Sequence, residues 1–152
     1  MSKIWVTGAA GFIGGRLAQK LTAEGHSVVA IDFKEAFAQR IELKNESFAA
    51  QIDPDVLLTQ LEQIERPTAI FHMGAITNTF EFSEEKLRRA NLEYSQHLWK
   101  WCTEHKVPLI YASSAATYGD GAQGYGDDEG KMNALKPLNP YGASKLHFDQ
   151  WA

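Results

Sequence analysis

The stretch TGAAGFIGG, residues 7–15, decides how this chain is expected to fold. It follows a short apolar run at residues 3–7 and precedes a segment of helical period. Three of its four glycines, Gly8, Gly11 and Gly14, stand three residues apart. A strand that ends in a glycine-rich turn and continues as a helix is the first half of a β-α-β unit.

Short apolar runs alternate with segments of helical period along the rest of the chain. This alternation is typical of a parallel sheet with helices on both faces, so we predict an α/β fold with a Rossmann-like, doubly wound sheet. The predicted strands are residues 3–7, 27–32, 48–52, 68–72 and 107–112. The predicted helices contain, at helical spacing, Phe12, Ile13, Leu17 and Leu21; Val56, Leu57, Leu61 and Ile64; and Leu87, Tyr94, Leu98 and Trp101.

Length and charge limit the possible partners. The chain has 152 residues, a length that suits one domain. Its 15 basic and 19 acidic residues give a net charge of −4, which argues against nucleic acid as a partner. No long apolar run or cleavage-site pattern follows Met1, so we expect a cytoplasmic protein without a membrane partner. The single cysteine, Cys102, lies in an apolar helical stretch and is expected in the core rather than as a nucleophile.

The three glycines have separate expected roles. Gly8 permits the tight turn, Gly11 lets the backbone approach a pyrophosphate, and Gly14 lets the helix pack closely on the strand. The helix that follows offers unpaired N–H groups to phosphates. The turn therefore predicts a dinucleotide site, and the alternative is a glycine turn that serves packing alone.

An acid stands where the second predicted strand ends. Asp32 is placed to accept hydrogen bonds from the adenosine ribose hydroxyls, and its charge repels a 2′-phosphate. We expect little compensation of that charge, except from Lys34 and Lys44. We therefore predict NAD as the cofactor, with NADP not excluded; the alternative is a surface acid without a ligand.

A helix near residue 140 carries a second candidate group. Asn139 can cap it, and Pro140 suits its first turn. Tyr141 and Lys145 are four residues apart, so both project from one face. A lysine charge and a helix N-terminus favour the phenolate form of a tyrosine, so the pair suits a general base. The alternative is a surface tyrosine and lysine on an ordinary amphipathic helix.

Four motifs, in order along the chain, give a family resemblance. TGAAGFIGG, FHMGA, YASSAATYG and YGASK together resemble the extended short-chain dehydrogenase/reductase superfamily, whose nucleotide-sugar epimerases are the most similar members. The resemblance implies a catalytic group of Ser114, Tyr141 and Lys145. It implies that Asn91 supports the active-site backbone. The cofactor contacts that we expect are Gly8, Gly11, Phe12, Ile13, Gly14, Asp32, Phe33, Gln51, Ile52, Met73, Gly74, Ala75, Asn91, Tyr141 and Lys145.

The chain departs from the superfamily pattern in three ways. Gln51 stands where an aspartate is frequent beside adenine, although glutamine can also hydrogen-bond the base. Ala115 stands beside Ser114 where a dehydratase normally has an acid, which favours an epimerase. Superfamily members are roughly twice this length, so we expect residues 1–152 to be an incomplete dinucleotide-binding domain, the cofactor half of a homo-oligomeric enzyme with a nucleotide-sugar substrate. A dinucleotide-binding module or fragment without catalysis, and an epimerase or reductase for another nucleotide sugar, remain alternatives.

Four further features have weaker expected roles. Residues 77–79 follow the fourth predicted strand. Two roles are open for them: contact with the ligand, or an ordinary polar turn. His72 is expected to support the end of that strand. The acids at residues 127–129 have no His or Cys beside them, so they predict a solvated run and no metal site. Residues 119–136, rich in Gly and Asp, predict a mobile loop beside the site.

Overall fold

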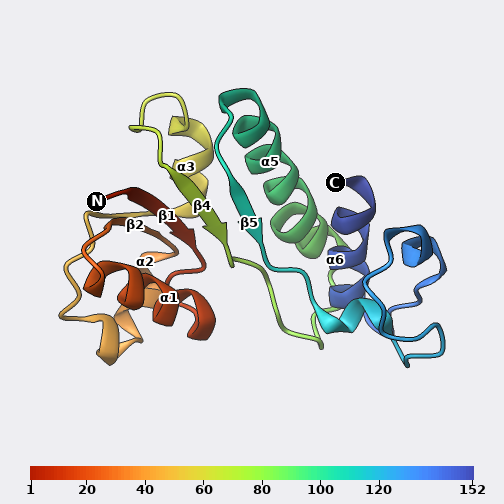
Figure 1. Cartoon of the computed structure of the whole chain (residues 1–152). Coiled ribbons are helices and arrows are strands. Elements are labelled where there is room, and N and C mark those ends of the chain that lie inside the picture. Colours follow the sequence, from red (N-terminus) through yellow and green to blue (C-terminus); the bar gives the residue numbers. More distant parts are fainter. The chain divides into compact units, whose positions relative to one another are not determined.

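The computed structural model describes all residues from Met1 to Ala152. The chain divides into two compact units. The first contains Met1–Gly74 and Leu98–Tyr111, and the second contains Ala75–His97 and Ala112–Ala152. Figure 1 labels the main helices and strands of both.

The first unit contains a parallel sheet of five strands in the order β3-β2-β1-β4-β5. This order confirms the predicted doubly wound, Rossmann-like sheet. Its strands are β1 (Lys3–Thr7), β2 (Ser27–Ile31), β3 (Ala50–Ile52), β4 (Ala69–His72) and β5 (Leu109–Tyr111).

All five predicted strands are present, but four are shorter than predicted. The largest differences are at the starts of β3 and β5, each two residues later than expected. Val107 donates its N–H to the Cys102 carbonyl instead of joining the sheet, and Pro108 has no N–H to donate. Because of the end of α5 and the proline, β5 begins only at Leu109.

The helices of the first unit are α1 (Phe12–Ala23), α2 (Lys34–Ala38), the 3-10 helix η1 (Ile41–Leu43), α3 (Pro54–Gln60) and most of α5 (Tyr94–His105). The side chain of Asp53 caps α3 by accepting from the Asp55 N–H, and Pro54 occupies the first turn. The predicted second helix, around Leu57, thus begins at a standard cap and ends at Gln60, before the predicted positions Leu61 and Ile64. The two short helices α2 and η1 were not predicted.

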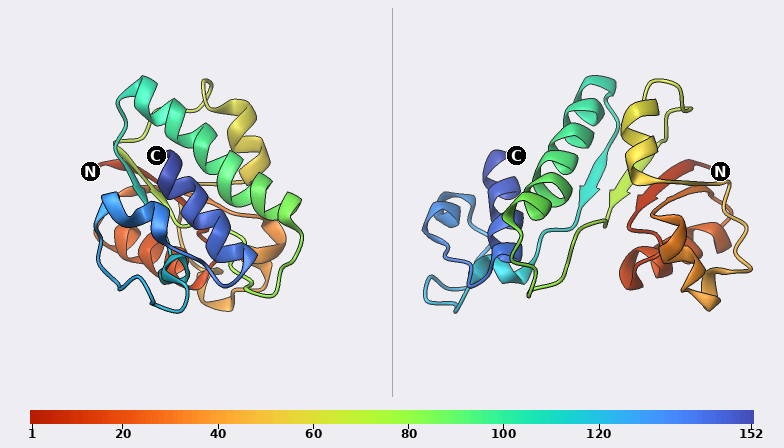
Figure 2. Two further views of the ribbon diagram at one scale, coloured as in Figure 1. Left: turned by 90° about the vertical axis from the view of Figure 1, so that its right-hand side faces the viewer. Right: turned by 180° about the vertical axis from the view of Figure 1, so that it is seen from behind.

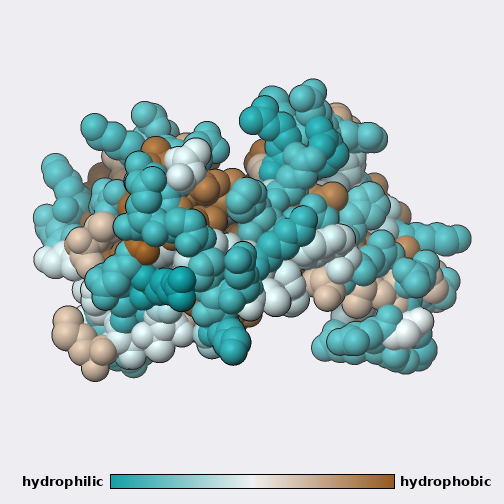
Figure 3. Space-filling view, turned by 90° about the horizontal axis from the view of Figure 1, so that it is seen from above, coloured by the Kyte–Doolittle hydropathy of each residue, from teal (hydrophilic) through white to brown (hydrophobic).

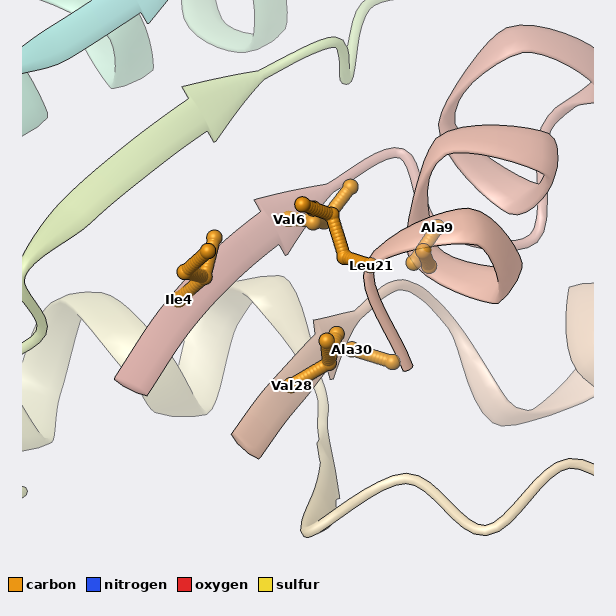
Figure 4. Close-up of a cluster of buried hydrophobic side chains, with 7 residues drawn as sticks. Ile4, Val6, Ala9, Leu21, Val28 and Ala30 are labelled. Carbon is orange, nitrogen blue, oxygen red and sulfur yellow. The ribbon is translucent and has the colours of Figure 1, made fainter. Parts of the chain in front are cut away.

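Residues of β1 alternate between the two faces of the sheet. Ile4 and Val6 belong to a buried cluster on the side of α1 (Figure 4). Trp5 is fully buried and stacks on Trp101 of α5, with ring centroids 5.6 Å apart. Helices therefore cover both faces, as predicted. The other buried members of the cluster are Ala9, Ala18, Leu21, Val28 and Ala30.

The start of α1 does not bury its large apolar residues. Phe12 and Ile13 are 75% and 68% exposed, whereas Gly14 and Ala18 are buried. The apolar spacing correctly predicted the helix, but small residues make its contact with the sheet. Phe12 and Ile13 are left at the surface beside the glycine turn.

The second unit is built around α6 (Pro140–Trp151), which packs against the segments η2 and η3. Figure 2 shows α6 from two further sides. The helical segments of this unit are α4 (Glu84–Leu87), the π-helix η2 (Arg88–Glu93), the first turn of α5, and the 3-10 helices η3 (Ala115–Tyr118) and η4 (Glu129–Ala134). The predicted loop at residues 119–136 thus contains a short helix.

None of the helices has the length and apolar character needed to cross a lipid bilayer. On the face drawn in Figure 3, hydrophilic residues predominate and apolar ones form separate patches.

Candidate functional site

The turn after β1 depends on two glycines. Gly8 has φ +67°, and a Cβ there would lie 2.7 Å from the Gly74 nitrogen. A Cβ on Gly14 would lie 2.2 Å from the Gly8 carbonyl oxygen. The tight turn at Gly8 and the close packing at Gly14 are therefore as predicted, and contact with a cofactor stays a prediction.

The N-terminus of α1 suits an anion. Gly11 is the N-cap residue, has no side chain to bind the first-turn N–H groups, and no acid occupies that turn. The exposed side chains of Phe12 and Ile13 flank the same turn. Free N–H groups at a helix N-terminus, with a glycine backbone that a ligand can approach, fit the pyrophosphate of a dinucleotide.

Asp32 is fixed against this turn. One carboxylate oxygen accepts from the Ala10 N–H at 2.9 Å, and the other accepts from the Phe33 N–H at 2.9 Å. A carboxylate oxygen has more than one lone pair, so both oxygens retain acceptor capacity for ribose hydroxyls. The predicted acid is thus at the edge of the sheet beside the glycine turn.

Sequence reasoning missed a cation at the same turn. Arg40 donates from Nη1 to the Ala10 carbonyl at 2.6 Å and from Nε to Glu42 at 2.9 Å. The hydrogen bond from Arg40 holds the pKa of the Glu42 carboxyl below its usual range. Arg40 stands eight residues after Asp32. The sequence feature that could have indicated this contact is a basic residue a few positions after the acid. It was not recognised because helix α2, which brings Arg40 back to the turn, was not predicted.

The end of β4 is held to the end of β1. The Thr7 hydroxyl lies 2.6 Å from Nδ1 of His72 and accepts from the Gly74 N–H at 3.0 Å. His72 is buried, which agrees with its predicted role as support for the strand end. At the carboxyl edge, Gln51 and Ile52 are in β3, Phe33 follows β2, and Met73 and Gly74 follow β4.

The helix of the second candidate group forms as predicted. Asn139 accepts from the Gly142 N–H at 2.8 Å, and Pro140 is in the first turn of α6. Tyr141 is half-buried and Lys145 is 3% exposed. Burial lowers the pKa of Lys145 from 10.5 to about 8, and the charge of Asp149 opposes that shift.

Ser114 is next to this helix. It caps η3 by accepting from the Ala116 N–H at 3.2 Å, and its own hydroxyl hydrogen remains available to donate. A Cβ on Gly142 would lie 2.7 Å from the Ala116 carbonyl oxygen, so α6 and η3 are in backbone contact. The structure therefore brings Ser114, Tyr141 and Lys145 onto adjoining elements.

Asn91 ties three parts of the second unit together. Its side chain is fully buried in the π-helix η2. It accepts from the Ile76 N–H at 2.8 Å, and it donates to the Ile76 carbonyl and to the Ser144 hydroxyl at 3.0 Å each. The loop after β4 and the helix α6 are thus fixed by one amide.

The predicted site residues fall into two groups, one in each unit. The first unit contains the glycine turn and the strand ends: Gly8, Gly11, Phe12, Ile13, Gly14, Asp32, Phe33, Gln51, Ile52, Met73 and Gly74. The second contains Ala75, Asn91, Ser114, Tyr141 and Lys145.

The weaker candidates take the following places in the structure, and contact of residues 77–79 with a ligand stays a prediction. Asn78 accepts from the Phe80 N–H at 3.0 Å, so residues 77–79 contain an ordinary turn. Burial raises the pKa of the Cys102 thiol to about 12, which agrees with a core residue. The acids at 127–129 are exposed, and no group of three or more His, Cys, Asp or Glu side chains is arranged to hold a metal ion.

A parallel sheet with this strand order, a glycine turn and an acid after β2 defines the Rossmann-like class of dinucleotide-binding proteins. Residues 4–152 match the NAD dependent epimerase/dehydratase family, and the chain belongs to that family. The family resemblance inferred from the four motifs is thereby confirmed.

Individual relatives agree with this assignment. An ADP-L-glycero-D-manno-heptose-6-epimerase of Nitratidesulfovibrio vulgaris (strain DP4) is 40% identical over 151 residues, which are 97% of this chain and 47% of the relative. The crystal structure of the Helicobacter pylori enzyme of the same name matches with a TM-score of 0.78 at 30% identity, over 99% of this chain and 49% of that one. MoeE5 in complex with UDP-glucose and NAD matches with a TM-score of 0.68 at 28% identity, over 97% and 47%. The chain therefore spans about half the length of the curated relatives it matches.

Proposed function

We propose that this chain is the cofactor-binding half of an NAD(P)-dependent nucleotide-sugar epimerase, with an ADP-heptose as substrate and NAD as the favoured cofactor. The observation that carries the proposal is the arrangement of Ser114, Tyr141 and Lys145 on two elements in backbone contact. Identity of 40% to an ADP-L-glycero-D-manno-heptose-6-epimerase supports the choice of sugar. From the family resemblance we also propose a cytoplasmic location, a role in lipopolysaccharide biosynthesis and assembly as a homo-oligomer.

The residues of the first unit fit NAD. The N-terminus of α1, capped by Gly11 alone, would hold the pyrophosphate. Asp32 would accept hydrogen bonds from the adenosine ribose, and Gln51 and Ile52 would border the adenine. When bound, the nicotinamide would supply the hydride-transfer chemistry of an epimerase.

The residues of the second unit would move and hold a proton. Tyr141 would take the proton of the sugar hydroxyl on the carbon that is oxidised and return it when that carbon is reduced. Ser114 would donate a hydrogen bond to the same oxygen. Lys145, with a pKa of about 8, carries its charge in most molecules at pH 7, and it stands one helical turn from Tyr141 on α6.

The test is turnover by the full-length gene product with Tyr141→Phe as the variant. Loss of the hydroxyl should lower kcat by ~10²-fold or more, the scale of a positioned general base, while NAD affinity is nearly unchanged. Tyr125→Phe is the matched control, because Tyr125 is 72% exposed in the loop before η4. Retention of activity within a few-fold by Tyr141→Phe would exclude this base. Conversion of a different nucleotide sugar, with none of an ADP-heptose, would exclude this substrate.

A dinucleotide-binding module without catalysis is the second candidate function. The observation in its favour is that the chain corresponds to 47% of its curated relative. Titration of the 152-residue chain with NAD, followed by the fluorescence of its four tryptophans, tests whether the chain binds the dinucleotide, and an assay of turnover by the full-length gene product separates the two candidates. Saturable binding without turnover by the full-length gene product would favour the module.

A further inference from the structure

Asp149 is a site residue that the four motifs did not indicate. It lies on α6, one helical turn beyond Lys145, and is partly buried. The Ser113 hydroxyl donates to its carboxylate at 2.5 Å. Ser113 directly precedes Ser114, so this carboxylate binds the segment that carries the proposed catalytic hydroxyl.

Two of the contacts between this segment and α6 lie on either side of Ser114. At one end, Gly142 meets the Ala116 carbonyl; at the other, Asp149 binds Ser113. On α6 the two contact points are seven residues apart, which is about 10 Å along the helix axis. Ser114 lies between the two contacts on its own segment. Contacts at two points fix both the position and the direction of the segment on the helix, which one contact cannot do.

Asp149 also acts on Lys145 by its charge. Burial lowers the pKa of Lys145, and the carboxylate one turn away raises it. Burial also raises the pKa of Asp149, whereas the hydrogen bond from Ser113 and the charge of Lys145 lower it by a smaller amount. The pKa of Tyr118 on η3 is also raised. The largest cause is its hydrogen bond to Asp127, and the charge of Asp149 raises it further.

We propose that Asp149 is a positioning residue for the Ser114, Tyr141 and Lys145 group, an inference that rests on the epimerase function proposed above. Through Ser113 it holds the Ser114 segment on α6, and by its charge it favours the ammonium form of Lys145. It acts through these two neighbours and touches no reacting atom.

The test separates the two effects with variants of the full-length gene product. Ser113→Ala removes the hydrogen bond alone, and kcat should fall about tenfold, the scale of one lost hydrogen bond to a charged group. Asp149→Asn keeps an acceptor for Ser113 and removes the charge. The basic limb of its pH profile for kcat/KM should move to lower pH by about half a unit or more. His147→Ala, an exposed position on α6, is the control and should change neither quantity.

Each result decides one part of the proposal. Variants at Ser113 and Asp149 that behave like His147→Ala would overturn it. If kcat/KM of Asp149→Asn were lower at every pH but the basic limb of its pH profile did not move, the proposed effect of the Asp149 charge on Lys145 would be overturned.

The contact itself has a readout that does not need activity. If the wild-type protein turns over no nucleotide sugar, the proposed epimerase fails, and amide hydrogen exchange still tests the contact with α6. The Thr117 and Gly119 amides bond within η3 and should exchange at least about tenfold faster in Ser113→Ala, because one of the two contacts that flank Ser114 is then missing. Equal exchange rates in variant and wild type would overturn the contact as a support for Ser114.

Discussion

Replacement of Gly14 by alanine tests the geometry of the glycine turn. The new Cβ would lie 2.2 Å from the Gly8 carbonyl oxygen, whereas carbon and oxygen in contact are about 3.3 Å apart. The turn and α1 would therefore have to separate by about 1 Å. The same Gly8 oxygen accepts the Gly11 N–H at 2.9 Å, so a shift at Gly8 also disturbs the hydrogen bond that closes the turn.

Two opposing effects set the size of the change. Alanine in place of glycine inside a helix would by itself stabilise by about 1 kcal/mol. Overpacking costs about 1–3 kcal/mol, and here both clashing groups are tied to backbone, which favours the upper end. We expect Gly14→Ala to lower the free energy of unfolding by about 2 kcal/mol and to weaken NAD binding at least about tenfold, since the anion-binding turn is displaced.

Urea unfolding and NAD titration, both followed by tryptophan fluorescence, measure the two effects. Gly126→Ala is the matched control: no atom lies within 4 Å of its Cβ position, and the expected change is below about 0.5 kcal/mol. A Gly14→Ala protein with the unfolding midpoint and NAD affinity of the control would show that the close approach is not needed.

Three further predictions concern single side chains. Asn91→Ala should lower the free energy of unfolding by about 2–3 kcal/mol, because both backbone groups of Ile76 lose a partner; an unchanged urea midpoint would contradict this. Lys145→Met should be more stable than wild type by about 3 kcal/mol at pH 7, because the buried amine has a pKa of about 8 when folded and binds its proton more tightly when unfolded. That difference should shrink as pH rises from about 8 towards 10.5, where the folded wild type carries a neutral amine; a difference independent of pH in urea titrations would refute the cause. Wild-type protein should bind NAD more tightly than NADP, because the Asp32 carboxylate repels a 2′-phosphate, and Asp32→Ser should reduce the preference at least about tenfold by calorimetry.

The sheet was predictable because each strand and helix has its own local pattern. The glycines of residues 7–15 define the first turn, and right-handed crossovers then restrict the strand order. The elements that were missed have no such pattern: α2 has five residues and η1 has three, too few for a helical period to emerge. The π-helical turn Arg88–Glu93 is also invisible, since apolar spacing at about four residues suits an α-helix and a π-turn alike.

The site divides in the same way. The roles of Gly8 and Gly14 and the cap at Asn139 follow from short stretches, and the structure contains them. The contacts of Arg40 with the turn and of Asp149 with Ser113 join residues 30 and 36 positions apart. No local pattern marks such pairs, so they become visible only when the elements are packed.

A buried lysine on α6 needs stabilisation from elsewhere in the same helix. Leu146, next in the chain, and Phe148 are 4% and 1% exposed. Burial of two such side chains contributes about 4 kcal/mol, and the Asn139 cap adds about 1 kcal/mol. These contributions exceed the roughly 3 kcal/mol by which the buried ammonium of Lys145 destabilises the fold at neutral pH. The buried apolar side chains and the cap therefore keep α6 folded with a charged lysine at a buried position. Removal of the cap or of the apolar side chains should increase the exposure of Lys145 before the sheet unfolds.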